Sequence, residues 1–161
     1  MEGIIGQGYL EVPYSLENTA LLLELEEALD DAEILRRRSL ELLEECEEKN
    51  IEHIVNSMNS LAGLLEFKGD LNGAYELYRQ CLVMVEKSSE MDDEYTADAY
   101  NNLANILGTM GELELALELM NRSLKIREEI YGLEDVRVAH SMNNLGMLME
   151  ANNDYYNAEM I

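Results

Sequence analysis

Asparagine recurs along this chain at a fixed spacing. The pattern comprises Asn59, Asn101 and Asn143, which follow one another at intervals of 42 residues, with Asn102, Asn105 and Asn144 beside them. A carboxamide carries a donor and an acceptor together, so it can bind the backbone of an extended peptide whatever the side chains of that peptide. Asn is a mediocre helix former, and its recurrence therefore needs a reason. Two reasons stay open, ligand binding and hydrogen bonds between adjacent repeats of the chain.

The other reactive residue types form no recognisable catalytic or metal-binding motif. Cys46 and Cys81 lack CxxC spacing, and His53 and His140 lie 87 residues apart. The sequence contains no P-loop, GxSxG or HExxH motif. We therefore expect a protein that is not an enzyme and that uses no cofactor or metal. We expect Cys81 to pack in the core and to be unreactive.

Acidic side chains outnumber basic ones, with 34 Asp and Glu against 11 Lys and Arg and a net charge of -23. Nucleic acids and anionic membranes attract Lys- and Arg-rich surfaces, so the charge argues against both and favours a basic protein or peptide partner. Solubility of an extended helical array accounts for the charge equally well. No apolar run approaches the roughly 20 residues of a membrane span. We expect a soluble chain in the reducing cytoplasm, and an organelle stays open if the N-terminus is processed.

The spacing of 42 residues extends to whole segments of the chain. SMNSLAGLLEFKGDLNGAYELY (57–78), AYNNLANILGTMGELELALELM (99–120) and SMNNLGMLMEANNDYYNAEMI (141–161) align in apolar and small-residue columns. Within each segment two apolar stripes recur at the spacing of one helix face. Gly69, Gly111 and Asn153 stand between the stripes, where a helix C-terminus favours a residue that tolerates the left-handed conformation. Each segment therefore predicts a pair of antiparallel helices, and no sheet is expected.

This pattern resembles the tetratricopeptide repeat, whose usual period is about 34 residues. The longer period, with AYNNLANILGTMGELELALELMNRSLKIREEIYG and the following VRVA, is similar to kinesin light chain repeats, and the resemblance covers residues 53–161. It implies an all-α fold, a right-handed α-solenoid of antiparallel helix pairs. It also implies a scaffold or adaptor for other proteins, in which the first helix of each pair lines a concave groove.

The same resemblance places the asparagine column in that groove. The predicted peptide-binding residues are Asn59, Asn101, Asn102, Asn105, Asn143, Asn144, Asp98, His140 and Met147. They include neither Lys nor Arg, so we expect a polar to acidic groove with a basic ligand. The alternative is a structural or assembly subunit that docks through its convex face or an open C-terminal end.

The repeat frame predicts five segments. They are an N-terminal arm at 1–13, a degenerate helical repeat at 14–50, repeats at 51–94 and 95–136, and a truncated repeat at 137–161. Pro13 is expected to separate the arm from the helices. Glu27 stands where later repeats carry glycine, so one long helix over 17–47 is an alternative to a helix pair. After a turn at Asn153 we expect only a helical stub from Tyr155, with a partner or further repeats covering that end.

Three consecutive arginines, Arg36, Arg37 and Arg38, form the one basic cluster of the sequence. Glu33 and Glu41 lie four residues before and after Arg37, at the spacing of helical ion pairs. We therefore expect a solvated ion-pair face and no docking patch.

Overall fold

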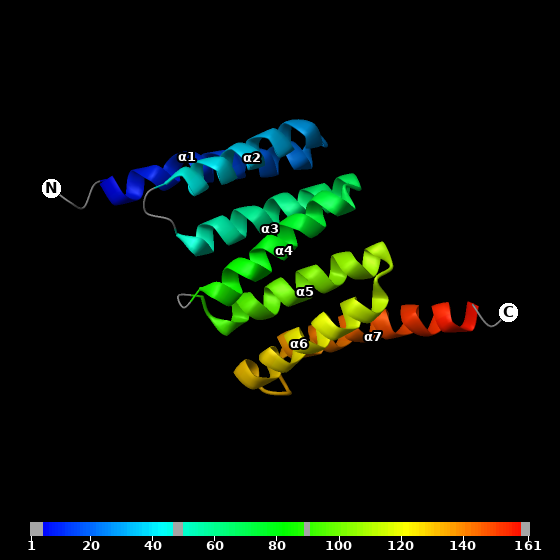
Figure 1. Cartoon of the computed structure of the whole chain (residues 1–161). Helices are drawn as coiled ribbons and strands as arrows, with labels where there is room; N and C mark the ends of the chain where they lie inside the picture. The colour runs from blue at the N-terminus through cyan, green and yellow to red at the C-terminus, as the bar shows by residue number, and fades with distance from the viewer. Residues whose placement is uncertain (1–4, 47–49, 89–90, 159–161) are drawn as a thin grey trace. The chain divides into compact units, whose positions relative to one another are not determined.

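The computed structural model describes residues 5–46, 50–88 and 91–158, and every regular element in these ranges is an α-helix (Figure 1). The helices are α1 (Ile5–Leu25), α2 (Leu29–Glu45), α3 (Ile51–Lys68), α4 (Leu71–Lys87), α5 (Asp93–Met110), α6 (Leu113–Tyr131) and α7 (Val136–Ala158). They pack in consecutive antiparallel pairs, which confirms the predicted all-α fold. The chain divides into two compact units, Met1–Leu77 and Tyr78–Ile161, each of which is described by itself. Among the described residues, none of the helices combines the length and hydropathy that crossing a bilayer requires.

The turns between paired helices follow the glycine column. Gly69 and Gly111 adopt φ of 85° and 87°, and each ends its helix in the left-handed conformation. The next backbone N–H, of Asp70 or Glu112, donates to the carbonyl five residues back, at 2.8 and 2.9 Å. This arrangement satisfies carbonyls that a helix end leaves free. The predicted turns at these two positions are therefore confirmed.

Glu27 takes the same role in the first helix pair without being glycine. Its φ is 62°, its N–H donates to the Glu24 carbonyl, and the N–H of Ala28 donates to the Leu23 carbonyl at 2.8 Å. The hydrogen bonds match those of the glycine turns residue for residue. The alternative of one long helix over 17–47 is therefore wrong, because α1 and α2 are separate helices that pack together.

Replacing Glu27 by glycine should stabilise the protein. A side chain in the left-handed region costs about 1–2 kcal/mol, part of which the greater freedom of glycine in the unfolded chain offsets. We expect Glu27→Gly to raise the free energy of unfolding by about 0.5–1 kcal/mol in urea denaturation. Glu27→Ala removes the same charge but keeps a Cβ, so it should give a smaller gain. Equal gains from both variants would assign the effect to charge and not to the backbone.

The small-residue columns lie where paired helices approach each other. Ala20 and Ala32 are fully buried in the first unit and pack with Leu64, and Ala104 and Ala116 are fully buried in the second. A small side chain at such positions allows close helix contact, as the sequence predicts.

Helix α1 differs from the expectation at its start. An arm ending at Pro13 was predicted, but α1 begins at Ile5 and continues through this proline; residues 1–4 of the arm lie outside the described ones. A proline within a helix loses one backbone hydrogen bond and usually costs about 3 kcal/mol. Here Pro13 is fully buried, and its carbonyl accepts the Ser39 hydroxyl at 3.2 Å. Packing and this hydrogen bond offset the loss. Division of the chain into repeats stays a prediction.

Helix α7 differs from the expectation at its end. A turn at Asn153 was predicted, yet α7 continues without a break from Val136 to Ala158. Asn adopts the left-handed conformation less readily than Gly. Continuing the helix satisfies the backbone hydrogen bonds that a turn would break.

Candidate functional site

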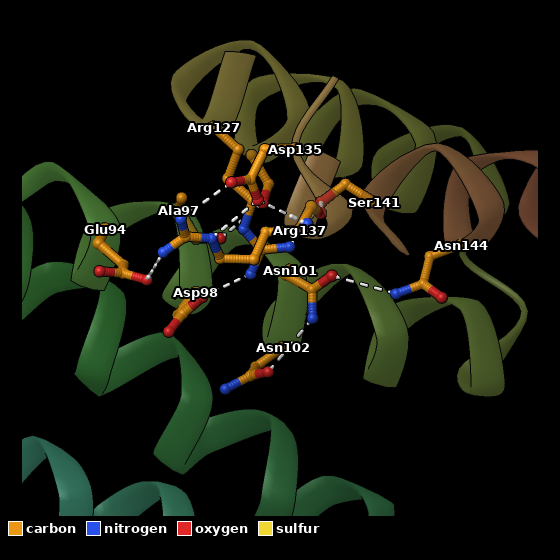
Figure 2. A network of polar contacts seen from close by, with 11 residues as sticks. Glu94, Ala97, Asp98, Asn101, Asn102, Arg127, Asp135, Arg137, Ser141 and Asn144 are labelled. Carbon is orange, nitrogen blue, oxygen red and sulfur yellow. Dashed lines mark hydrogen bonds and ion pairs between the residues drawn. The ribbon is translucent and has the colours of Figure 1, made fainter. Parts of the chain in front are cut away.

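Helices α5 and α7 in the second unit bring most of the predicted binding residues together. Along α5, Asp98, Asn101 and Asn105 lie at the spacing of one helix face. The Asn144 amide on α7 donates to the Asn101 carbonyl oxygen at 3.3 Å, and the Asn101 amide donates to Asn102 at 3.4 Å (Figure 2). The two helices thus present adjoining polar faces. The hydrogen bond between Asn101 and Asn144 also supports the second reason for the asparagine column, contact between adjacent repeats.

The outer members of this polar face are exposed. Asn105 on α5 and His140, Asn143 and Met147 on α7 all face solvent. The Asn143 amide lies 3.7 Å from the Met147 sulfur, one turn along the same helix. A thioether is a weak acceptor, so the amide of Asn143 keeps most of its capacity to bind a ligand.

Two arginines that were not among the predicted binding residues adjoin this face. The Arg127 guanidinium on α6 donates to the Asp98 carboxylate and to the Ser141 hydroxyl (Figure 2). Its side chain is mostly buried, whereas that of Asp98 is half exposed. The charge of Asp98 is therefore partly neutralised, and the face is less acidic than expected. Arg127 escaped notice because its counterpart one repeat earlier is the apolar Val85.

The second arginine, Arg137, closes the turn between α6 and α7. It donates to both carboxylate oxygens of Asp135 at 2.9 and 3.0 Å and lies over the Tyr131 ring at 3.3 Å. These bonds hold the pKa of the Asp135 carboxyl down at about 2. Glu94 at the start of α5 approaches the same arginine at 3.7 Å. The group ties α5 to α7 beside the polar face.

In the first unit two residues occupy the repeat position of the asparagine column. They are Asn59 on α3 and, 42 residues earlier, Glu17 on α1. Glu17 is engaged, because its carboxylate accepts from the buried Arg36 and from the Ser57 hydroxyl. The Asn59 carboxamide oxygen is different. It is buried, and none of the residues that the structure describes donates a hydrogen bond to it. A buried acceptor without a partner is rare in folded proteins, so this oxygen calls for an explanation.

The basic cluster behaves partly as predicted. Arg37 pairs with Glu33 on the exposed face of α2, but Glu41 pairs with Arg38 and not with Arg37. Arg36 contradicts the expectation of a solvated face. It is buried and forms ion pairs with Glu17 and Glu24 of α1, because its position points inward between the two helices.

A serine column inside the helix pairs carries a second recurring contact. The Ser39 hydroxyl donates to the Pro13 carbonyl, and the Ser123 hydroxyl donates to the Ala97 carbonyl at 2.7 Å. Both serines are fully buried, and each reaches the first helix of its own pair 26 residues back.

Cys81 occupies the same column and should be chemically inert. It is fully buried, and burial raises the pKa of its thiol to about 12. The thiolate is the reactive form, so at pH 8 the folded chain should react with a thiol reagent such as dithionitrobenzoate only at the partly exposed Cys46. Release of one equivalent before unfolding and two after it is the expected result. Two fast equivalents in the folded protein would contradict the burial of Cys81.

No group of His, Cys, Asp and Glu suited to holding a metal ion occurs within the part of the chain that the structure describes.

Comparison with known proteins agrees with this architecture. Residues 95–161 match the family model of the tetratricopeptide repeat. Residues 95–161 therefore carry tetratricopeptide repeat sequence, and the described helices have a tetratricopeptide-like fold. No curated protein sequence matches it significantly. Tetratricopeptide repeats typically form non-catalytic scaffolds that mediate contacts between proteins.

Solved structures of similar fold include kinesin light chain-like repeats. BtubC (BKLC) from P. vanneervenii is 26% identical with a TM-score of 0.76, and the match covers 88% of this chain and 56% of that one. Repeats of a Podosopora anserina protein named for kinesin light chain are 19% identical with a TM-score of 0.77, over 92% of this chain and 71% of that one. RapI is 17% identical with a TM-score of 0.78, and the match covers 96% of this chain and 41% of RapI. The chain thus spans about half the length of BtubC or RapI.

Proposed function

We propose that this protein is an adaptor that binds an extended, basic segment of a partner protein on the faces of its first helices. The observation that carries the proposal is the polar face of α5 and α7. There the Asn101–Asn144 hydrogen bond joins two rows of asparagines whose outer members, Asn105 and Asn143, are exposed. Each carboxamide in this face has donors and acceptors left over for a peptide backbone.

Charge supports a basic ligand. The chain carries a net charge of -23, and the two arginines beside the polar face are already engaged with Asp98 and Asp135. A negatively charged surface attracts a basic segment and raises its association rate, by an amount that falls as salt screens the charges.

Peptide selection tests this proposal. A randomised dodecapeptide phage library panned on the full chain should yield peptides rich in Lys and Arg, and their association should slow as salt is raised. Asn101→Ala should weaken their binding by up to about tenfold for each ligand hydrogen bond lost. Affinity is measured by isothermal titration calorimetry, with thermal melting recorded for the same sample.

Asn121→Ala is the matched control, because Asn121 lies exposed on α6 and its amide donates to the Leu117 carbonyl of its own helix. It should leave affinity unchanged. If Asn101→Ala lowers the melting temperature and binding is otherwise normal, Asn101 is a structural residue between repeats. If affinity is unchanged, docking through another surface, as expected of an assembly subunit, becomes the better account.

A further inference from the structure

Two hollows adjoin along α1 and α3 in the first unit. One has a volume of about 390 Å³ and is lined chiefly by Leu21, Leu25 and Phe67. The other has a volume of about 280 Å³ and is lined by residues that include Glu17 and Glu52. Ser60 lines both, so the two hollows adjoin, and together they are called the groove, with an apolar end and an acidic end. The larger volume lies in the range of about 300–1,000 Å³ that is typical of ligand sites.

The apolar end exposes large side chains that a folded chain usually covers. Phe67 is 78% exposed, Leu25 76% and Leu21 52%. Leu21 and Leu25 stand one turn apart on α1, and Phe67 lies on the last turn of α3. Single exposed apolar residues need no explanation, but a contiguous group around a hollow marks an interaction surface.

Asn59 provides an independent sign of a ligand at this end. Asn59 lines the apolar hollow, and its carboxamide oxygen is buried with no hydrogen-bond donor among the described residues. A small rotation of the carboxamide towards a ligand N–H would satisfy this oxygen. A peptide backbone that places a side chain in the hollow offers such a donor.

The other end suits a positive charge. Glu17 and Glu52 line it. Arg36 pairs with both Glu17 and Glu24, so these three side chains together keep one negative charge, and Glu52 adds a second. The chain as a whole is strongly acidic, so the groove complements a basic segment and repels an acidic one.

We propose that this groove receives a segment of a partner protein that carries one bulky apolar side chain and, a few residues away, a Lys or Arg. The apolar side chain fills the hollow between Leu21, Leu25 and Phe67. The basic side chain lies beside Glu17 and Glu52. The inference rests on the proposed adaptor function and adds to it a requirement for an apolar anchor, which the polar face of α5 and α7 does not supply.

The test uses the peptides selected on the full chain as its probe. They should share a Leu, Phe or Met near a Lys or Arg, and Phe67→Ser should weaken their binding about tenfold or more, because an apolar contact of this size is lost. Glu52→Gln should reduce affinity less and should reduce its salt dependence. Ile34→Ser, which changes another largely exposed apolar residue on α2 of the same unit, is the control and should have no effect.

The outcomes separate this inference from the proposed function. Peptides that lose affinity in Asn101→Ala but bind Phe67→Ser and Glu52→Gln as they bind the wild type would overturn the inference and leave the adaptor function standing. Selected peptides without an apolar residue would overturn it too. Peptides that lose affinity in Phe67→Ser alone would support it and remove Asn101 from the site. Failure to select any peptide would overturn both.

Discussion

Arg36→Met should destabilise the first unit by about 2–3 kcal/mol, the largest effect that we expect of a single substitution in this chain. Arg36 is buried between α1 and α2 and pairs with Glu17 and Glu24. Methionine matches its length but leaves both carboxylates without a cation. Removing one partner of a fully buried ion pair costs about 3–5 kcal/mol, and the partial exposure of the two glutamates lowers that figure.

Arg37→Met is the matched control for this prediction. Arg37 is the next residue on the same helix, is half exposed and pairs only with Glu33 in the described contacts. An exposed helical ion pair contributes about 0.3–0.5 kcal/mol, so this variant should unfold almost as the wild type does. Chemical denaturation followed by circular dichroism compares the two. Equal losses would mean that Arg36 is not buried as described.

Ala104→Leu should cost the second unit about 1–3 kcal/mol. Ala104 is fully buried on α5, in the small-residue column where the helices of a pair approach each other. Three additional carbon atoms there require the helices to separate or neighbouring side chains to leave their preferred rotamers. The same denaturation experiment measures the loss.

Gly146→Ala tests whether every position of the small-residue column excludes a larger side chain, or only the positions that are closely packed. Gly146 occupies the same column on α7, but a Cβ built there meets no atom within 4 Å. Alanine is the better helix former, so this substitution should stabilise the chain by about 0.5–1 kcal/mol. A loss at both positions would show that α7 packs more closely than described.

Much of the fold follows from the sequence, because the same residue types recur at the turns and helix contacts of successive repeats. Glycine at 69 and 111 predicts the two regular turns, and the small columns predict the helix contacts. Glu27 shows the limit of this reasoning. Its backbone takes the glycine conformation because packing of α1 on α2 outweighs the local cost, a balance that residue type alone does not reveal. At Asn153 local preference predicts a turn, and the structure has none.

The sequence predicts which asparagines lie in the candidate site, but it does not predict the contacts that they make. Column spacing identified Asn101 and Asn144, yet only the structure shows that they bond to each other. Arg127 and its contact with Asp98 could not be found from the repeat, since an ion pair between helices needs no counterpart in other repeats. The unpartnered oxygen of Asn59 likewise depends on side-chain packing in three dimensions.

Side-chain amide resonances offer the most direct test of which helix faces bind a partner. With the chain labelled with ¹⁵N, a selected basic peptide should shift the side-chain amides of Asn101, Asn105 and Asn143, which lie on α5 and α7 of the second unit. The amide of Asn121 on α6 should stay unchanged. Shifts on α6 with none in the asparagine column would contradict the proposal that the first helices form the binding face.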